Sequence, residues 1–290
     1  MPINQGFAAQ ALLVLLFLLT IGHLLTLKLC SVKLDHRTAP IFISFWTLLG
    51  VAAVSPFFGH LWAEGWEKLT AAPYLLGLCL VKGALLYLLF VISQELMQES
   101  LSSRHYVTPL SVGLVAMVNG SLGEQLLPGQ WISALGLCAL AAAFFFKGHL
   151  ADLSRRGKIT YIKLVCLSVF LSSLDHVLTK NSNWFSLLLV SNVTLLGLSL
   201  ALNRSRIAVL KDALFHKYAA LAGIFYMATE LVKFYQQVSI NPVTVVVTVQ
   251  AATKPVILIL SALLWKERTV REQLVWGVLA FIITLPLFFK

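Results

Sequence analysis

Charged residues are scarce in this chain of 290 residues, where lysine, arginine, aspartate and glutamate together make up 12%. Soluble domains carry about 25% charged residues, so this composition excludes a soluble globular protein. Hydrophobic residues reach 59%, and the mean hydropathy is +0.86. Apolar runs of roughly 20 residues recur, and a helix of that length spans a bilayer. The sequence therefore predicts an integral membrane protein built from helices.

Cysteine is equally rare, with one residue in each of four separate segments: Cys30, Cys79, Cys138 and Cys166. No two of them have a CxxC spacing, so we expect neither a disulfide framework nor a metal site. The common catalytic and nucleotide-binding motifs are missing as well, namely GxSxG, HExxH, the Walker loop and the dinucleotide fingerprint. We therefore expect no enzyme activity, no catalytic residues, no cofactor and no ATP-driven transport.

Acidic residues are outnumbered, 12 against 22 lysines and arginines, which leaves a net charge of +10. The basic residues gather in short loops and form no continuous face, so nucleic acid is not an expected partner. Counting loops from the N-terminus, the odd-numbered loops hold 16 of the 22 basic residues. The positive-inside rule then predicts that these loops are cytoplasmic and that both chain ends lie outside, in a bacterial inner membrane.

Ten runs have the length and hydropathy of a transmembrane helix, and short loops without room for an extramembrane domain join them. The predicted spans are Ala8–Cys30, Ala39–His60, Pro73–Ser93, Ser102–Gly123, Pro128–Phe146, Tyr161–Lys180, Asn183–Leu202, Tyr218–Gln237, Asn241–Trp265 and Arg271–Phe289.

The two halves of the chain also resemble each other. A shift of 143 residues pairs Gln94 with Gln237 and Glu124 with Glu267. Each half would contain five spans, an odd number, so two such units in tandem must have opposite orientations. We therefore expect an all-α membrane protein with ten transmembrane helices, arranged as two inverted five-helix repeats over residues 1–147 and 148–290.

Lys254 lies near the middle of the apolar run Asn241–Trp265 and is followed by Pro255, which breaks a helical hydrogen bond. An ammonium group at that depth is costly and is kept where a helix lines a wet cavity enclosed by protein. Gln250, one turn earlier, and the adjacent Thr253 extend the same polar surface. We predict that Lys254 attracts a carboxylate or phosphate of the substrate. The alternative is a lysine that pairs with a buried acid and holds helices together.

Lys82 interrupts another apolar run and is followed by Gly83, a small residue that permits close helix approach. It is either a second contact for an anion or the partner of a buried acid. Glu230 has Lys233 three residues further on, so the two side chains can pair on one helix. Alternatively, Glu230 binds a substrate amine or carries a coupling proton, since a desolvated carboxyl group can titrate near neutral pH.

A polar face is expected on the predicted span Tyr161–Lys180, because Ser172, Asp175, His176 and Thr179 recur at helical spacing. Asp175 and His176 would then be candidates for a proton relay. They could equally be interfacial residues near the outer end of the span. Glu124 and Glu267, in the turns that end the fourth and ninth spans, are expected to cap helix ends or form salt bridges.

The segment Leu122–Ile132 reads LGEQLLPGQWI and resembles the end of the EamA repeat of the drug/metabolite transporter superfamily. In that repeat a short glycine–glutamate turn joins the fourth and fifth helices of each half. The segment Trp265–Val270 occupies the same place in the second half, with Lys266 in place of the glycine. Members of the superfamily often carry an arginine in the second helix, which this chain lacks at Phe45–Thr47.

The resemblance implies an alternating-access carrier of small metabolites, and the substrates of the superfamily range from amino acids to sugar phosphates, nucleotide sugars and amines. Its central cavity would be lined by spans one, three, four, six, eight and nine. The mixed charges there favour an amino acid or another carboxylate-bearing compound, whose carboxylate binds the lysines and whose amine binds an acid.

Three alternatives stay open. They are a carrier of a phosphorylated or otherwise anionic metabolite, a flippase component for a lipid-linked head group, and a membrane enzyme or assembly factor. In the favoured hypothesis the chain exports or imports its substrate as a monomer or homodimer, with membrane lipid around it.

Overall fold

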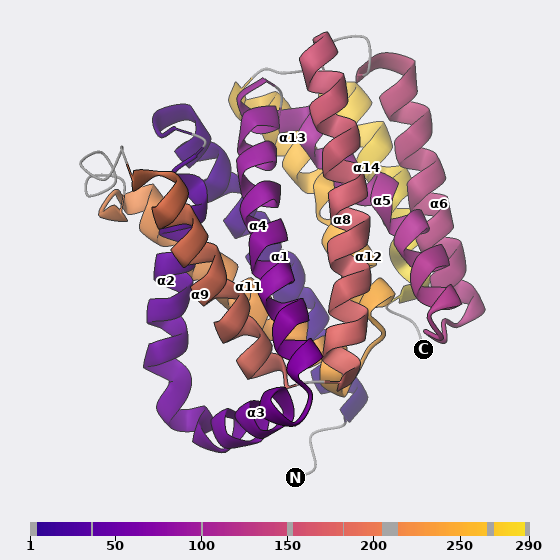
Figure 1. Cartoon of the computed structure of the whole chain (residues 1–290). Helices are drawn as coiled ribbons and strands as arrows, with labels where there is room; N and C mark the ends of the chain where they lie inside the picture. The colour runs from indigo at the N-terminus through magenta and orange to yellow at the C-terminus, as the bar shows by residue number, and fades with distance from the viewer. Residues whose placement is uncertain are drawn as a thin grey trace.

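The computed structural model describes residues 5–35, 37–99, 101–149, 153–181, 183–204, 214–265 and 270–287. Over these ranges every regular element is a helix and there is no strand, which confirms the predicted all-helical class. The helices stand side by side in one bundle (Figure 1). Seven of them are long and apolar enough to cross a membrane, so the chain is an integral membrane protein.

The elements, in chain order, are α1 (Gln5–Lys33), α2 (Ala39–Val54), the 3-10 helix η1 (Ser55–Phe58), α3 (Gly59–Ala71), α4 (Pro73–Glu99), α5 (Leu101–Ser121), α6 (Pro128–Phe144), the π-helical turn η2 (Phe145–His149), α8 (Arg155–Asn181), α9 (Trp184–Leu202), α11 (Lys217–Ser239), α12 (Val243–Ala252), α13 (Lys254–Trp265), α14 (Val270–Thr284) and the 3-10 helix η4 (Leu285–Leu287).

The seven spanning candidates are α1, α2 with η1, α4, α6, α8, α9 and the continuous pair α12–α13. The other three predicted spans are helical too, as α5, α11 and α14. Helix α5 opens with Arg104 and His105, α11 carries Glu230 and Lys233, and α14 has only 15 residues. These helices pack among the seven: α11 against α1 and α2, α5 against α6 and α8, and α14 against α6 and α13.

The second predicted span, Ala39–His60, corresponds to α2 together with η1, and a helix that we did not expect follows it. Helix α2 ends at Val54, because Pro56 enters a tight 3-10 turn, and the chain then forms α3 where we expected a loop. Helix α3 lies across the lower end of the bundle (Figure 1). Gly65 and Leu69 are its buried residues, and a Cβ atom at Gly65 would lie 2.5 Å from a side-chain oxygen on α9. The short amphipathic helix is therefore packed onto α9.

The ninth predicted span is divided at Thr253, between α12 and α13, as expected from Pro255. The N–H of Thr253 donates to the carbonyl of Gln250 and the N–H of Ile257 to that of Thr253, both at 3.3 Å. The break therefore interrupts the helix without separating its two parts. It makes Lys254 the first residue of α13. Helix α5, by contrast, runs through its own Pro109 without a break.

The close packing of α4 against α9 depends on Gly83, next to Lys82. A Cβ atom at Gly83 would lie 2.5 Å from Cβ of Thr194 and 2.6 Å from the carbonyl oxygen of Ser191. No side chain fits there without a shift of α9. The small residue thus allows the close helix approach that we expected beside Lys82.

Candidate functional site

A cavity of about 180 Å³ lies inside the bundle and is lined by α1, α4, α5, α8, α11 and the α12–α13 pair. These are the helices at the predicted spans one, three, four, six, eight and nine. Five of the predicted site residues line the cavity: Lys82, Asp175, Glu230, Gln250 and Lys254. The structure therefore brings together side chains that lie far apart in the chain.

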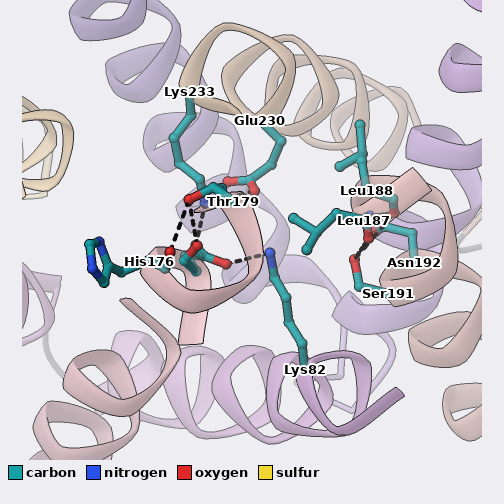
Figure 2. Close-up of polar contacts among 10 residues, drawn as sticks. Lys82, His176, Thr179, Leu187, Leu188, Ser191, Asn192, Glu230 and Lys233 are labelled. Atoms are coloured by element: carbon teal, nitrogen blue, oxygen red, sulfur yellow. Dashed lines mark hydrogen bonds and ion pairs between the residues drawn. The ribbon is translucent and has the colours of Figure 1, made fainter. Parts of the chain in front are cut away.

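Four of the lining residues form an ion-pair cluster, made of Lys82, Asp175, Lys233 and Glu230 (Figure 2). The Lys82 ammonium lies 2.5 Å from one oxygen of Asp175, and the Lys233 ammonium lies 3.2 Å from the other. The Lys233 ammonium is also 2.8 Å from a Glu230 oxygen. The ring of Phe234 lies beneath both cations, its centroid 4.2 Å from the Lys82 nitrogen and 4.6 Å from that of Lys233. Charges thus alternate along the cluster, which is neutral as a whole.

The cluster bears on two of the alternatives left open by the sequence. Lys82 pairs with a buried acid, and Glu230 forms the intrahelical pair with Lys233. The cluster joins α4, α8 and α11, so it also holds three helices in register. Removing one member of a buried ion pair costs about 3–5 kcal/mol. Neither Asp175 nor Glu230 is therefore free to take a substrate amine unless an existing pair opens.

The cavity has a second polar region, which is cationic. Lys254 and Arg104 both line it and are only 3% and 9% exposed. Across the described ranges neither forms an ion pair with a carboxylate. The Nε of Arg104 donates to the hydroxyl of Ser93 at 2.5 Å, whereas Nη1 is buried without a hydrogen-bond partner. Lys254 and Arg104 are referred to below as the cation pair.

Arg104 was not among the predicted site residues, because we counted it with the basic residues of the third loop. The signal was its position inside the predicted span Ser102–Gly123 rather than in the loop itself. With Arg104 included, four basic and two acidic side chains line the cavity, a formal charge of +2 when His23 is neutral.

His23 is a hydrogen-bonded histidine of the cavity wall. Its Nδ1 lies 3.2 Å from the carbonyl oxygen of Ala222, and its ring centroid lies 5.3 Å from that of Tyr226. A lone histidine on a helix usually has this role, and His23 needs no other partner to explain its burial. Hydroxyl groups complete the polar wall, from Thr20, Ser93, Thr108, Ser111, Ser168, Ser172, Tyr226 and Thr229.

Two predicted site residues, Thr253 and His176, do not line the cavity. Thr253 is fully buried at the helix break, and its hydroxyl donates to the carbonyl of Gln250 at 2.7 Å. His176 follows Asp175 on α8 but is rotated by about 100° around the helix, so its ring points away from the ion-pair cluster (Figure 2). The structure does not form the Asp175–His176 relay that the sequence suggested.

His176 instead lines a second pocket of about 640 Å³, which we call the vestibule. Its Nδ1 lies 3.6 Å from Glu124. The Glu124 carboxylate accepts hydrogen bonds from the backbone N–H of Thr244, at 3.1 Å, and from the Thr244 hydroxyl. Glu124 thus caps the N-terminal end of α12, the capping role that we expected. Its counterpart Glu267 lies outside the described residues.

The ion-pair cluster lies between the cavity and the vestibule. On α8, Asp175 is the last residue to line the cavity, and His176 is the first to line the vestibule. On α11, Lys233 is the last cavity residue and Gln237 lines the vestibule. The cation pair lies in the part of the cavity that is far from the vestibule. The C-terminal end of α5 lies beside the vestibule, and Arg104 is the α5 residue of the cavity wall that is nearest to the other end of the helix.

No protein-family model matches the chain, and no curated protein matches it either. The resemblance to the EamA repeat therefore stays an expectation. The functional assignment rests on the geometry and charge of the cavity.

Proposed function

We propose that this protein is a secondary carrier that moves a small carboxylate-bearing or otherwise anionic metabolite across a bacterial cytoplasmic membrane by alternating access. The observation that carries the proposal is the net positive cavity that six helices of an apolar bundle line. Ionisable residues inside a membrane bundle are costly and mark substrate or ion pathways. Carriers bind their substrates at such a site near the bilayer midplane.

The packing of the helices supports two related five-helix units, residues 1–147 and 148–290. Matching α1, α2, α4, α5 and α6 in order with α8, α9, α11, α12–α13 and α14 gives each main contact a counterpart. The contact of α1 with α11 corresponds to that of α8 with α4, and α2 with α11 corresponds to α9 with α4. The contact of α5 with α6 corresponds to that of α13 with α14, and α5 with α8 corresponds to α12 with α1.

We infer from this correspondence that α5, α11 and α14 also cross the membrane, which makes ten spans. Helix α1 begins and α14 ends toward the same end of the bundle, as an even number of spans requires (Figure 1). The distribution of basic residues then puts both ends and the vestibule outside. In this orientation the ion-pair cluster closes the cavity on the outer side. To admit a substrate from outside, the carrier would have to separate the helices that the cluster joins. Asp175 and Glu230 remain candidates for proton coupling, through the opening of one pair.

The geometry favours an anion over a zwitterion such as an amino acid, because both cavity acids already bind lysines. The flippase alternative calls for a lateral opening toward lipid with Lys82 or Lys254 facing it. Both lysines are at most 3% exposed, and the apolar groove between α5 and α8 is lined by neither. The carrier is therefore the better supported of the two.

Counterflow in proteoliposomes tests the proposal. Vesicles containing the purified protein are loaded with an unlabelled solute, and entry of the same labelled solute is followed for succinate, glycerol 3-phosphate, glutamate and putrescine. We expect one anionic class to accumulate transiently and Lys254→Ala to abolish the effect. Arg155→Gln, an exposed basic residue at the start of α8 that lines neither the cavity nor the vestibule, is the control and should retain it. Absence of counterflow for every solute with folded protein would argue against a carrier.

A further inference from the structure

We propose that the cation pair, Arg104 and Lys254, is a subsite for a solute with two negative charges, a small dicarboxylate or phosphate monoester. The inference rests on the proposed carrier function and names the charge of the solute carried. Binding of the dianion to the purified protein tests this subsite, and no transport assay is needed.

The charge balance of the cavity is the first support. Two acids and two lysines neutralise each other in the ion-pair cluster, so the formal charge of +2 is the charge of Arg104 and Lys254. Buried charges without a partner are costly, and proteins pair them or bind a counter-ion. A monoanion or a zwitterion would leave part of this charge uncompensated. A dianion would balance it.

The bonding capacity of Arg104 is the second support. Its Nε is held by the Ser93 hydroxyl at 2.5 Å, which fixes the plane of the guanidinium group. Its buried Nη1 has no hydrogen-bond partner among the residues that the structure covers. A guanidinium group can bind a carboxylate or phosphate through two parallel hydrogen bonds, and Nη1 keeps its N–H groups for such an anion.

The position of Lys254 is the third support. It follows the helix break directly and lies one turn beyond Gln250, so both polar side chains line the same face of the cavity. Helices α5 and α13 also pack against each other and occupy matching places in the two proposed units. An anion held between Arg104 and Lys254 would therefore bridge the two halves.

The size of the cavity limits the solute. A volume of about 180 Å³ is smaller than the roughly 300–1,000 Å³ of sites for drug-sized ligands. It suits a compact anion better than a nucleotide sugar or a whole lipid. Gln250 and the hydroxyl of Thr108 line the same cavity and can donate hydrogen bonds to further oxygens, whereas the Ser111 hydroxyl already donates to the carbonyl of Thr108 at 2.9 Å.

Ligand-induced thermal stabilisation of the purified protein in detergent tests the subsite. The probes are succinate, glycerol 3-phosphate, acetate, glutamate, putrescine and, as simple anions, sulfate and chloride at equal ionic strength. We expect succinate or glycerol 3-phosphate, and sulfate as a further dianion, to raise the apparent melting temperature, and acetate, chloride, glutamate and putrescine to have little effect. The response to succinate compared with the response to glycerol 3-phosphate distinguishes a carboxylate solute from a phosphate solute.

Variants locate the binding. Arg104→Gln and Lys254→Gln should each lower the affinity for the stabilising dianion at least tenfold. Arg104→Lys should also lower it, because an ammonium group cannot form two parallel hydrogen bonds as a guanidinium group can. The matched control is Lys28→Gln, a buried lysine that lies outside the cavity, where its ammonium donates to the carbonyl of Met97 at 2.7 Å. It should keep the affinity of the unaltered protein.

A second measurement does not depend on the identity of the ligand. Because the empty subsite holds unpaired charge, Lys254→Met should leave the ligand-free protein at least as stable as the parent, whereas loss of a structural ion pair would destabilise it. A marked loss of stability in Lys254→Met would overturn the proposal. So would equal stabilisation by sulfate and chloride, binding of glutamate or putrescine alone, or unchanged affinity in Arg104→Gln and Lys254→Gln.

The two proposals fail separately. Dianion binding that depends on the cation pair, without counterflow of any solute, would leave the subsite standing and overturn the carrier. Counterflow of a neutral, zwitterionic or cationic solute, without dianion binding, would overturn the subsite and leave the carrier standing.

Discussion

One oxygen of Asp175 on α8 lies 2.5 Å from the ammonium of Lys82 on α4, and its other oxygen lies 3.2 Å from Lys233 on α11. A single carboxylate thus joins three helices at the end of the cavity that faces the vestibule. Among the residues that the structure describes, Glu230 pairs with Lys233 alone, so the two acids of the cluster are not equivalent.

Asp175→Asn is expected to destabilise the protein by about 3–5 kcal/mol, because it leaves Lys82 buried without its counter-ion. Glu230→Gln should cost less, since Lys233 keeps Asp175 as a partner. Unfolding in detergent for both variants tests the ranking. In the double variant Lys82→Met/Asp175→Asn, part of the loss should be recovered. A larger effect of Glu230→Gln than of Asp175→Asn would contradict the arrangement described.

Gly83→Val is expected to lower the unfolding free energy by about 1–3 kcal/mol, because the new side chain would press on the carbonyl of Ser191 and on Thr194. Gly77→Val is the matched control, since it lies on the same helix and a Cβ atom there meets nothing within 4 Å. Thermal unfolding of the two variants in parallel is the measurement. Equal effects would mean that α4 and α9 do not approach as closely as described.

Glu124→Ala is expected to destabilise the protein by about 0.5–2 kcal/mol, the usual cost of losing a side-chain cap. The N–H and the hydroxyl of Thr244 would both lose their acceptor at the start of α12. Gln125→Ala changes an exposed neighbour and serves as the control. If the two variants unfold at the same temperature, the cap contributes nothing measurable.

The proposed orientation predicts which cavity is reached from outside the cell. In a background without the four native cysteines, Gln237→Cys in the vestibule should react with a membrane-impermeant maleimide added to intact cells. Ser111→Cys in the central cavity should react slowly, because the ion-pair cluster closes the outer side. Labelling of Gln237→Cys only in inside-out vesicles would reverse the orientation.

Much of the fold was predictable, because the energetics of a bilayer act on local sequence. A run of about 20 apolar residues has few options other than a helix, so every predicted span is helical, although the ninth is divided into α12 and α13. The break before Pro255 followed from the missing N–H of proline. Burial of Lys82 and Lys254 in a shared cavity followed from the cost of an ammonium group in hydrocarbon.

Other features depended on how the helices are rotated and which of them meet. Hydropathy gives the depth of a residue and says little about the direction in which its side chain points. For that reason the neighbours Asp175 and His176 were predicted to act together, yet they line different pockets. For the same reason Arg104 was not predicted as a site residue: it lies near the end of a predicted span, and only the packing of α5 shows that it lines the cavity.

The sequence by itself determined that this is a helical membrane protein with costly charges in its interior, because that follows from the free energy of each segment in lipid. Only the tertiary structure decided how those charges are divided. Lys82 and Lys233 are neutralised by acids on helices packed beside them, whereas no carboxylate in the described ranges reaches Lys254 or Arg104. Pairing depends on contacts between helices far apart in the chain, and no local pattern encodes such contacts.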